Sequence, residues 1–194
     1  MSVTQVLSNH LDGPLGRWWH PFSAWLSGAP YRAFSKHALA KDIRTGLPRA
    51  VFDNFYKFAF VRNPWDWNVS NYHYILKHPD HYQHAELKAL GGFEAYVDWQ
   101  VDNHYTQKYV LADETGNLVV DYVGHMERLE ADFNHILSHL GLPPVKIPHK
   151  NRSDHTDYRG YYNDHTRALI AELFSDDIEA FGYTFDGLKS SAHE

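Results

Sequence analysis

The sequence predicts an α/β protein in which a parallel sheet is flanked by helices. Lys57–Val61 is an aromatic and β-branched run that predicts a buried strand, and it stops at Asn63-Pro64. Leu118–Val123 is a second such run, and a string of turn-forming residues at 113–117 precedes it. Segments with helical spacing follow both runs. Strands that alternate with helices of this size favour a parallel sheet.

Five segments are expected to be helical. Ala38–Leu47 predicts a short helix that ends near Gly46 and Pro48. Thr166–Phe181 predicts the last helix, closed by Gly182. The other three have apolar residues at helical spacing: Val69, Tyr72 and Leu76; Phe93, Val97 and Val101; and Leu129, Phe133, Ile136, Leu137 and Leu140, with Gly141 placed to end the helix.

The chain divides into three parts by composition. Residues 1–35 are rich in glycine, proline and tryptophan, which indicates an irregular aromatic segment that packs on something else. Residues 36–186 hold the predicted strands and helices and form the main domain, and 187–194 form a tail. Within the main domain, Pro143–Tyr162 is a long polar loop, and loops of this length are often functional.

Composition limits the classes of function. The net charge of −6 argues against a nucleic-acid binder. The segment from Lys36 to Arg62, however, contains six basic residues and only two acidic ones, which favours a pocket for a small anion. The absence of cysteine excludes disulfides and thiolate metal sites. No run is long and apolar enough to span a bilayer and no signal peptide is visible, so we expect a cytoplasmic protein.

The predicted strand at 57–61 delivers Arg62 to its carboxyl end, where open α/β sheets bind ligands. Ser70 follows eight residues later, inside the next predicted helix. The arginine fork matches a phosphate, and a serine hydroxyl adds one more donor. The alternative from spacing alone is an arginine paired with Asp66 and a serine that only caps a helix.

The residues around this pair carry a recognisable motif. Residues 60–66 read Phe-Val-Arg-Asn-Pro-Trp-Asp, and residues 69–72 read Val-Ser-Asn-Tyr. They resemble the Phe-Val-Arg-Asn-Pro-Trp/Tyr-Asp…Val-Ser-x-Tyr signature of the carbohydrate-type sulfotransferases, especially the bacterial members grouped as sulfotransferase family 2.

Further segments resemble this family in the family's own order, from about Lys36 to Asp186. Residues 36–44 resemble its Lys-His-x-Ser-Ala-x-Glu-Ile-Arg segment, and residues 102–107 its His-Trp-x-x-Gln segment. Residues 120–132 resemble its Asp-Phe-Val-Gly-x-x-Glu-x-Leu-x-x-Asp segment. Its C-terminal end is matched by residues 151–153, Tyr161-Tyr162 and residues 177–185.

The resemblance implies a P-loop-NTPase-like three-layer sandwich and transfer of a sulfuryl group from 3′-phosphoadenosine 5′-phosphosulfate (PAPS) to an acceptor hydroxyl. The transfer leaves adenosine 3′,5′-bisphosphate. In the family the arginine and serine of the signature grip the 3′-phosphate, which assigns this role to Arg62 and Ser70. As in phosphoryl transfer, positioning and charge neutralisation are expected to dominate. A carbohydrate hydroxyl is the acceptor that the resemblance implies, and lipids or other small molecules stay open as alternatives.

The general base is expected to be His37, since a histidine in the matching segment fills this role in some relatives. Neighbouring cations would lower its pKa and keep it neutral, as a base requires. The alternative is an ordinary surface histidine. Glu127 is a second candidate base, although its place at a helix start favours a carboxylate that holds a loop.

Two other groups are expected at the site by resemblance. His104 and Gln107 either line the acceptor pocket or tie down a loop. Lys150, Arg152 and Ser153 lie in the long loop that, in the family, folds over the nucleotide; the alternative is a solvated polar loop.

The sequence departs from the family in two places. Nothing before Lys36 resembles the Pro-Lys-x-Gly-Thr-Ser loop that cradles the 5′-phosphosulfate, nor the apolar strand that leads into it. Trp67-Asn68 stands where relatives usually have Arg-Leu. Three explanations are open: a misplaced coding start, a non-catalytic relative that still binds a nucleotide, or residues 1–35 patching the sheet and mediating oligomerisation.

Two remaining patterns have ordinary explanations. His78, His81 and His84 are three residues apart and could gather a metal, but Pro79 interrupts them and a polar surface is favoured. We therefore expect no metal. Residues 68–70 and 151–153 fit the glycosylation triplet, and chance accounts for both.

Overall fold

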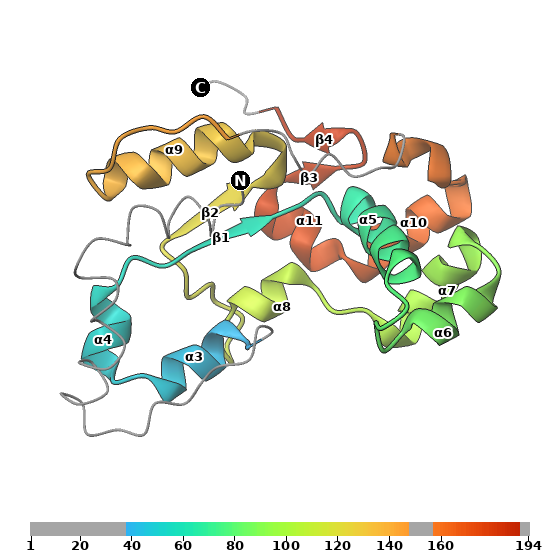
Figure 1. Cartoon of the computed structure of the whole chain (residues 1–194), viewed down its shortest axis with the longest axis horizontal. Coiled ribbons are helices and arrows are strands. Elements are labelled where there is room, and N and C mark those ends of the chain that lie inside the picture. The colour runs from blue at the N-terminus through green and yellow to red at the C-terminus, as the bar shows by residue number, and fades with distance from the viewer. Residues whose placement is uncertain (1–37, 148–156, 191–194) are drawn as a thin grey trace. The chain divides into compact units, whose positions relative to one another are not determined.

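The computed structural model describes residues 38–147 and 157–190 (Figure 1). In chain order the elements are α3 (Ala40–Gly46), α4 (Arg49–Asn54), β1 (Phe58–Val61), α5 (Pro64–Lys77), α6 (His84–Leu90), α7 (Phe93–Asn103), α8 (Gln107–Leu111), β2 (Tyr122–His125), η1 (Met126–Arg128), α9 (Leu129–His139), η2 (Tyr158–Tyr161), α10 (Asp164–Leu173), α11 (Ser175–Phe181), β3 (Tyr183–Thr184) and β4 (Gly187–Leu188). The aromatic segment expected at 1–35 lies outside the described residues.

Helices and strands are mixed, as the α/β prediction requires. β1 and β2 form a two-stranded parallel sheet, and β3 and β4 form a second, antiparallel one. Gly187 pairs with Thr184, so the segment expected to be a tail, 187–194, begins with a paired strand. In the described part of the chain, no helix has the length and apolar character needed to cross a membrane.

The second strand begins later than the sequence predicts. Leu118 lies outside β2 and instead bridges Ala112 in an antiparallel pair. The Asp113 carboxylate closes the turn between them by accepting from the N–H groups of Thr115 and Asn117. The residues before Tyr122 are therefore used by a local turn, which leaves only the end of the predicted run for pairing with β1.

The chain divides into two compact units. The first takes residues 38–59, 111–124 and 128–147 of the described chain. Its core comes from α9, where Phe133, Ile136 and Leu137 are fully buried as their spacing predicts. Leu140, expected on the same face, is 42% exposed because it lies past the end of the helix. Gly141 follows with a φ of 68°, a conformation that favours glycine.

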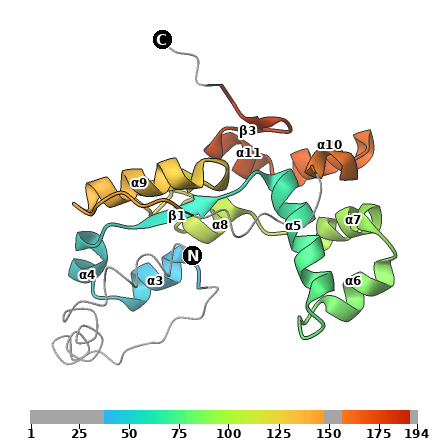
Figure 2. The same ribbon diagram turned by 45° about the horizontal axis from the view of Figure 1, so that its top comes forward.

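The second unit takes residues 60–110, 125–127 and 157–190 of the described chain. α7 lies beside α10, and α6 lies beside α5; Figure 2 shows both pairs from a second direction. Its core is an aromatic and aliphatic cluster made of Trp65, Ile75, Leu87, Tyr96, Val97, Ile170 and Phe174. The helical spacing predicts Val101 on the buried face of α7, but this residue is 49% exposed, because Tyr96 and Gln100 take the inward positions instead.

The last predicted helix is two helices. The break falls at Phe174, whose side chain is fully buried and whose backbone leaves the helical region at φ −108°, ψ 22°. Asp176 and Asp177 then occupy the first turn of α11, where acidic residues complement the positive end of a helix. Burial of the aromatic ring and a new helix start therefore outweigh continuation of α10.

Candidate functional site

Arg62 leaves the end of β1, and its main chain is held by the Gln107 side chain. The Arg62 N–H donates to Gln107 Oε1 at 2.9 Å, and Gln107 Nε2 donates to the Arg62 carbonyl at 2.8 Å. A primary amide can make these two hydrogen bonds at once because it carries a donor and an acceptor side by side. The amide therefore fixes the peptide groups on both sides of the arginine.

Gln107 is itself held by a buried carboxylate. Asp177 Oδ2 accepts from the Gln107 N–H at 2.8 Å and from its Nε2 at 3.3 Å, and Oδ1 accepts from the Lys108 N–H at 2.7 Å. Asp177 is 0% exposed, and this burial raises its pKa. Gln107 therefore joins the main chain at Arg62 to Asp177 of α11.

Asn63, the next residue, is fixed from another direction. Its N–H donates to Glu127 Oε1 at 2.7 Å, and its side-chain amide donates to the Thr184 carbonyl at 2.8 Å. Its Oδ1 accepts from the Trp65 N–H and caps α5. Glu127 Oε2 accepts from the Tyr183 hydroxyl, so Glu127 holds the Asn63 turn, as its place in the motif predicts.

The Arg62 side chain turns toward α5. Its Nε donates to Asp66 Oδ2 at 2.6 Å, and the two side chains are 22% and 19% exposed. Ser70 is half-buried one helical turn beyond Asp66, and residues four apart lie on the same side of a helix. In the described part of the chain, no protein group bonds the Ser70 hydroxyl. Asp66 and Ser70 therefore lie on one side of α5, and the Arg62 side chain is bonded to Asp66 at the start of this side.

A buried polar network lies under this part of α5, and sequence reasoning missed it. Asn68 is 0% exposed; its Nδ2 donates to the Pro64 carbonyl and its Oδ1 accepts from Gln100 Nε2 at 2.6 Å. Gln100 Nε2 also lies 2.6 Å from the Tyr96 hydroxyl, and burial raises the pKa of Tyr96. Because the Asn68 amide is buried and bonded, the 68–70 triplet is no site for a glycan.

The other predicted residues are placed as follows. His104 Nδ1 lies 3.0 Å from the Gln100 carbonyl, and its ring packs edge-on against Phe174. His37, Lys150, Arg152 and Ser153 lie outside the described residues. The described part of the chain has no cluster of three side chains that could hold a metal ion. This applies also to the segment with His78, His81 and His84.

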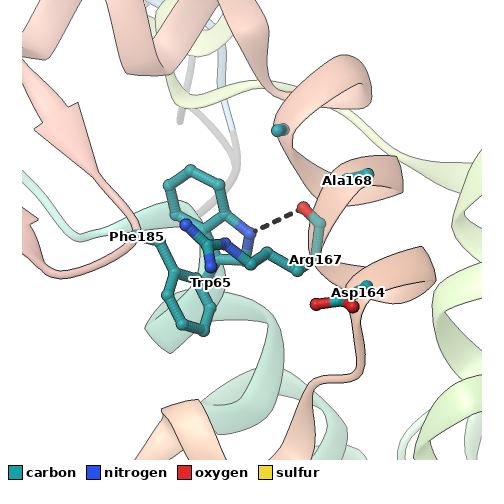
Figure 3. A pocket seen from close by; sticks show the side chains of 6 residues that line it. Trp65, Asp164, Arg167, Ala168 and Phe185 are labelled. Atoms are coloured by element: carbon teal, nitrogen blue, oxygen red, sulfur yellow. Dashed lines mark hydrogen bonds between the residues drawn. The ribbon is translucent and has the colours of Figure 1, made fainter.

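A pocket of about 390 Å³ opens between α10 and the β3–β4 turn (Figure 3). The Arg167 guanidinium lies over the Phe185 ring at 4.3 Å, and Trp65 Nε1 donates to the Arg167 carbonyl. Asp164, Ala168 and Ala171 complete the lining. Of the predicted site residues, those that the structure describes, Arg62, Ser70, His104 and Gln107, are not among its lining residues.

One known family matches the region of β1 and α5 and most of the rest of the chain. The model of a family described as the sulfotransferase family matches residues 30–184, which is most of the chain and includes Arg62, Ser70 and Gln107. The chain belongs to the sulfotransferase family. This confirms the resemblance inferred from the ordered motifs and supports a transferase.

One relative of this sulfotransferase-family chain is an uncharacterised protein from Archaeoglobus fulgidus. The two are 28% identical over 119 residues, which cover 60% of this chain and 93% of the relative. No solved structure gives a significant match.

Proposed function

We propose that this chain binds the adenosine 3′-phosphate part of PAPS through Arg62 and Ser70 and serves sulfuryl transfer to a carbohydrate hydroxyl. One observation carries the proposal. The main chain of Arg62 is clamped by Gln107, its side chain is turned by Asp66, and Ser70 follows on the same side of α5. A fixed guanidinium is suited to a phosphate, because little ordering is left to occur on binding, and the Ser70 hydroxyl can add a further donor.

The residues present fit the 3′-phosphate. A guanidinium matches a phosphate through paired N–H donors, and the Arg62 Nε also donates to Asp66. Asp66 also reduces the local positive charge, so we propose that Lys150, Arg152 and Ser153 add donors to the same nucleotide. When bound, PAPS supplies an activated sulfuryl group. His37 is the proposed general base, and a P-loop-like three-layer arrangement is the proposed fold around the site.

A second candidate is a catalytically impaired module that binds the nucleotide without transferring sulfate. Trp67-Asn68, which stands where relatives usually have Arg-Leu, favours it, because the arginine would place a positive charge close to the nucleotide site. Both candidates need the 3′-phosphate grip, and they differ in whether labelled sulfate passes from PAPS to a sugar.

The test is thermal unfolding with adenosine 3′,5′-bisphosphate. A ligand that binds only the folded state raises the melting temperature, so the wild-type chain should show a rise and Arg62→Ala should show none. Arg49→Ala is the matched control, because Arg49 is a surface arginine with a 93% exposed side chain. Adenosine 5′-monophosphate, which lacks the 3′-phosphate, should give a smaller rise. No rise in the wild type at millimolar nucleotide would refute the proposal.

A further inference from the structure

The row of residues that starts at Asp66 continues along α5 into aromatic side chains. Tyr74 follows Ser70 by four residues, and His78 caps the helix four residues later. Steps of four turn by about 40° around a helix and rise 1.5 Å per residue, so Tyr74 lies roughly 6 Å beyond Ser70 and His78 roughly 12 Å. Beyond the residues proposed to hold the phosphate, this side of α5 is therefore aromatic.

Four rings gather at this end of the helix: Tyr74, His78, His81 and Tyr82, here called the aromatic platform. Tyr74 and His78 have ring centroids 4.1 Å apart, and His81 stacks on Tyr82 at 4.8 Å. Tyr74 and His81 meet edge-on at 6.0 Å and join the two pairs. The platform is thus one continuous set of ring contacts.

The platform is both fixed and exposed. His78 Nδ1 lies 2.6 Å from the Tyr74 carbonyl, and His81 Nδ1 accepts from the Gln83 N–H at 3.3 Å. Tyr82 is nevertheless 85% exposed and Tyr74 53%. Rings that stay exposed to water do not contribute the free energy that burial of apolar surface gives to folding. Exposed apolar patches of this kind mark binding surfaces.

A third exposed tyrosine lies in the segment expected near the acceptor. Tyr105 lies between His104 and Gln107, is 52% exposed and packs edge-on against Trp67 at 5.7 Å. Burial of part of the ring raises the pKa of Tyr105, and the charge of the Tyr82 phenol raises it further.

The chemistry of these rings favours a sugar. A pyranose offers an apolar C–H face and hydroxyl edges, and tyrosine and histidine offer an apolar face with a polar edge. His78 and His81 use Nδ1 for local bonds, which leaves Nε2 to meet a hydroxyl. The chain's net charge of −6 disfavours a polyanion at the same surface.

We infer that the aromatic platform binds the carbohydrate acceptor by stacking on its sugar rings. The identity of this sugar as the acceptor rests on the proposed function, whereas sugar binding by the platform does not. The row along α5 would then hold the nucleotide phosphate at Ser70 and begin the sugar surface at Tyr74.

The test is direct binding of neutral tetrasaccharides built from glucose, galactose or N-acetylglucosamine. Saturation-transfer NMR detects the binding, and calorimetry measures the affinity. At least one probe should bind the wild-type chain, and Tyr74→Ala and Tyr82→Ala should each weaken it by about tenfold. Tyr74→Phe keeps the ring and should retain most of the affinity. Tyr109→Ala is the matched control, because Tyr109 is 52% exposed but lies on α8.

Outcomes for the platform and for the proposed function separate cleanly. Sugar binding without any melting-temperature rise from adenosine 3′,5′-bisphosphate would keep the platform and refute the nucleotide site. A nucleotide-induced rise with no probe bound at millimolar concentration would refute the platform alone. Equal losses in Tyr82→Ala and Tyr109→Ala would also refute it, since the effect would then not belong to these rings.

Discussion

The Gln107 side chain makes two hydrogen bonds with the main chain of Arg62, one through its oxygen and one through its nitrogen, although 45 residues separate the two. Main-chain bonds position a residue without using its side chain. The Gln107 hydrogen bonds therefore fix the main chain of Arg62 at the end of β1 and leave its guanidinium unused. The guanidinium pairs with Asp66 instead.

Gln107→Leu should lower the affinity for adenosine 3′,5′-bisphosphate by about tenfold, because the Arg62 N–H and carbonyl lose their partners and the arginine loses its fixed position. Isothermal calorimetry measures the change. Asn103→Leu is the control, since Asn103 carries an exposed amide that bonds only locally, to the Trp99 carbonyl. An unchanged dissociation constant in Gln107→Leu would show that the clamp does not serve the nucleotide.

The Gln107 clamp also shows where sequence reasoning stops. The apolar run before Arg62 and the Asn63-Pro64 break are local signals, and both the strand and the start of α5 follow them. Tertiary packing decides which distant residue the side-chain amide of Gln107 bonds. The local spacing of apolar and polar residues carries no information about such a long-range partner. For this reason the motif could point to Gln107 but left its role open.

The same limit explains the errors in the fold. The spacing of Phe93, Val97 and Val101 predicts one apolar face, yet the core under α5 is partly polar, and Gln100 turns inward to meet Asn68. The spacing around Phe174 predicts one continuous helix through this residue. Its complete burial bends the chain there, and only the packed structure reveals this.

Asn68→Leu should destabilise the chain by about 1–3 kcal/mol, because Gln100 and Tyr96 lose an acceptor in a buried environment. Urea unfolding measures the free energy. The double variant Asn68→Leu/Gln100→Leu should recover part of this loss, since it removes the stranded amide as well. Strictly additive losses in the double variant would mean that the two amides do not depend on each other.

Acid should destabilise the chain in part through Asp121. Its pKa is lowered, first by the hydrogen bond from the Lys57 ammonium and then by the Lys57 N–H. A lowered folded-state pKa gives stability that is present above the unfolded value of about 3.9 and lost as the pH falls through the folded value. Asp121→Asn should therefore flatten the fall in stability below pH 4, as measured by urea unfolding at a series of pH values. A slope equal to that of the wild type would contradict this assignment.

The start of α10 offers a test of local stability away from the proposed site. Asn163 Oδ1 accepts from the Thr166 N–H at 2.8 Å, and Thr166 Oγ1 accepts from the Asn163 N–H at 3.1 Å, which makes a reciprocal cap. Asn163→Ala should cost about 1 kcal/mol of unfolding free energy, and Asn163→Gly only a few tenths, because glycine tolerates the cap conformation. Neither change should alter the melting-temperature rise from adenosine 3′,5′-bisphosphate. If Asn163→Ala abolished that rise while the chain stayed folded, α10 would have to be counted as part of the nucleotide site.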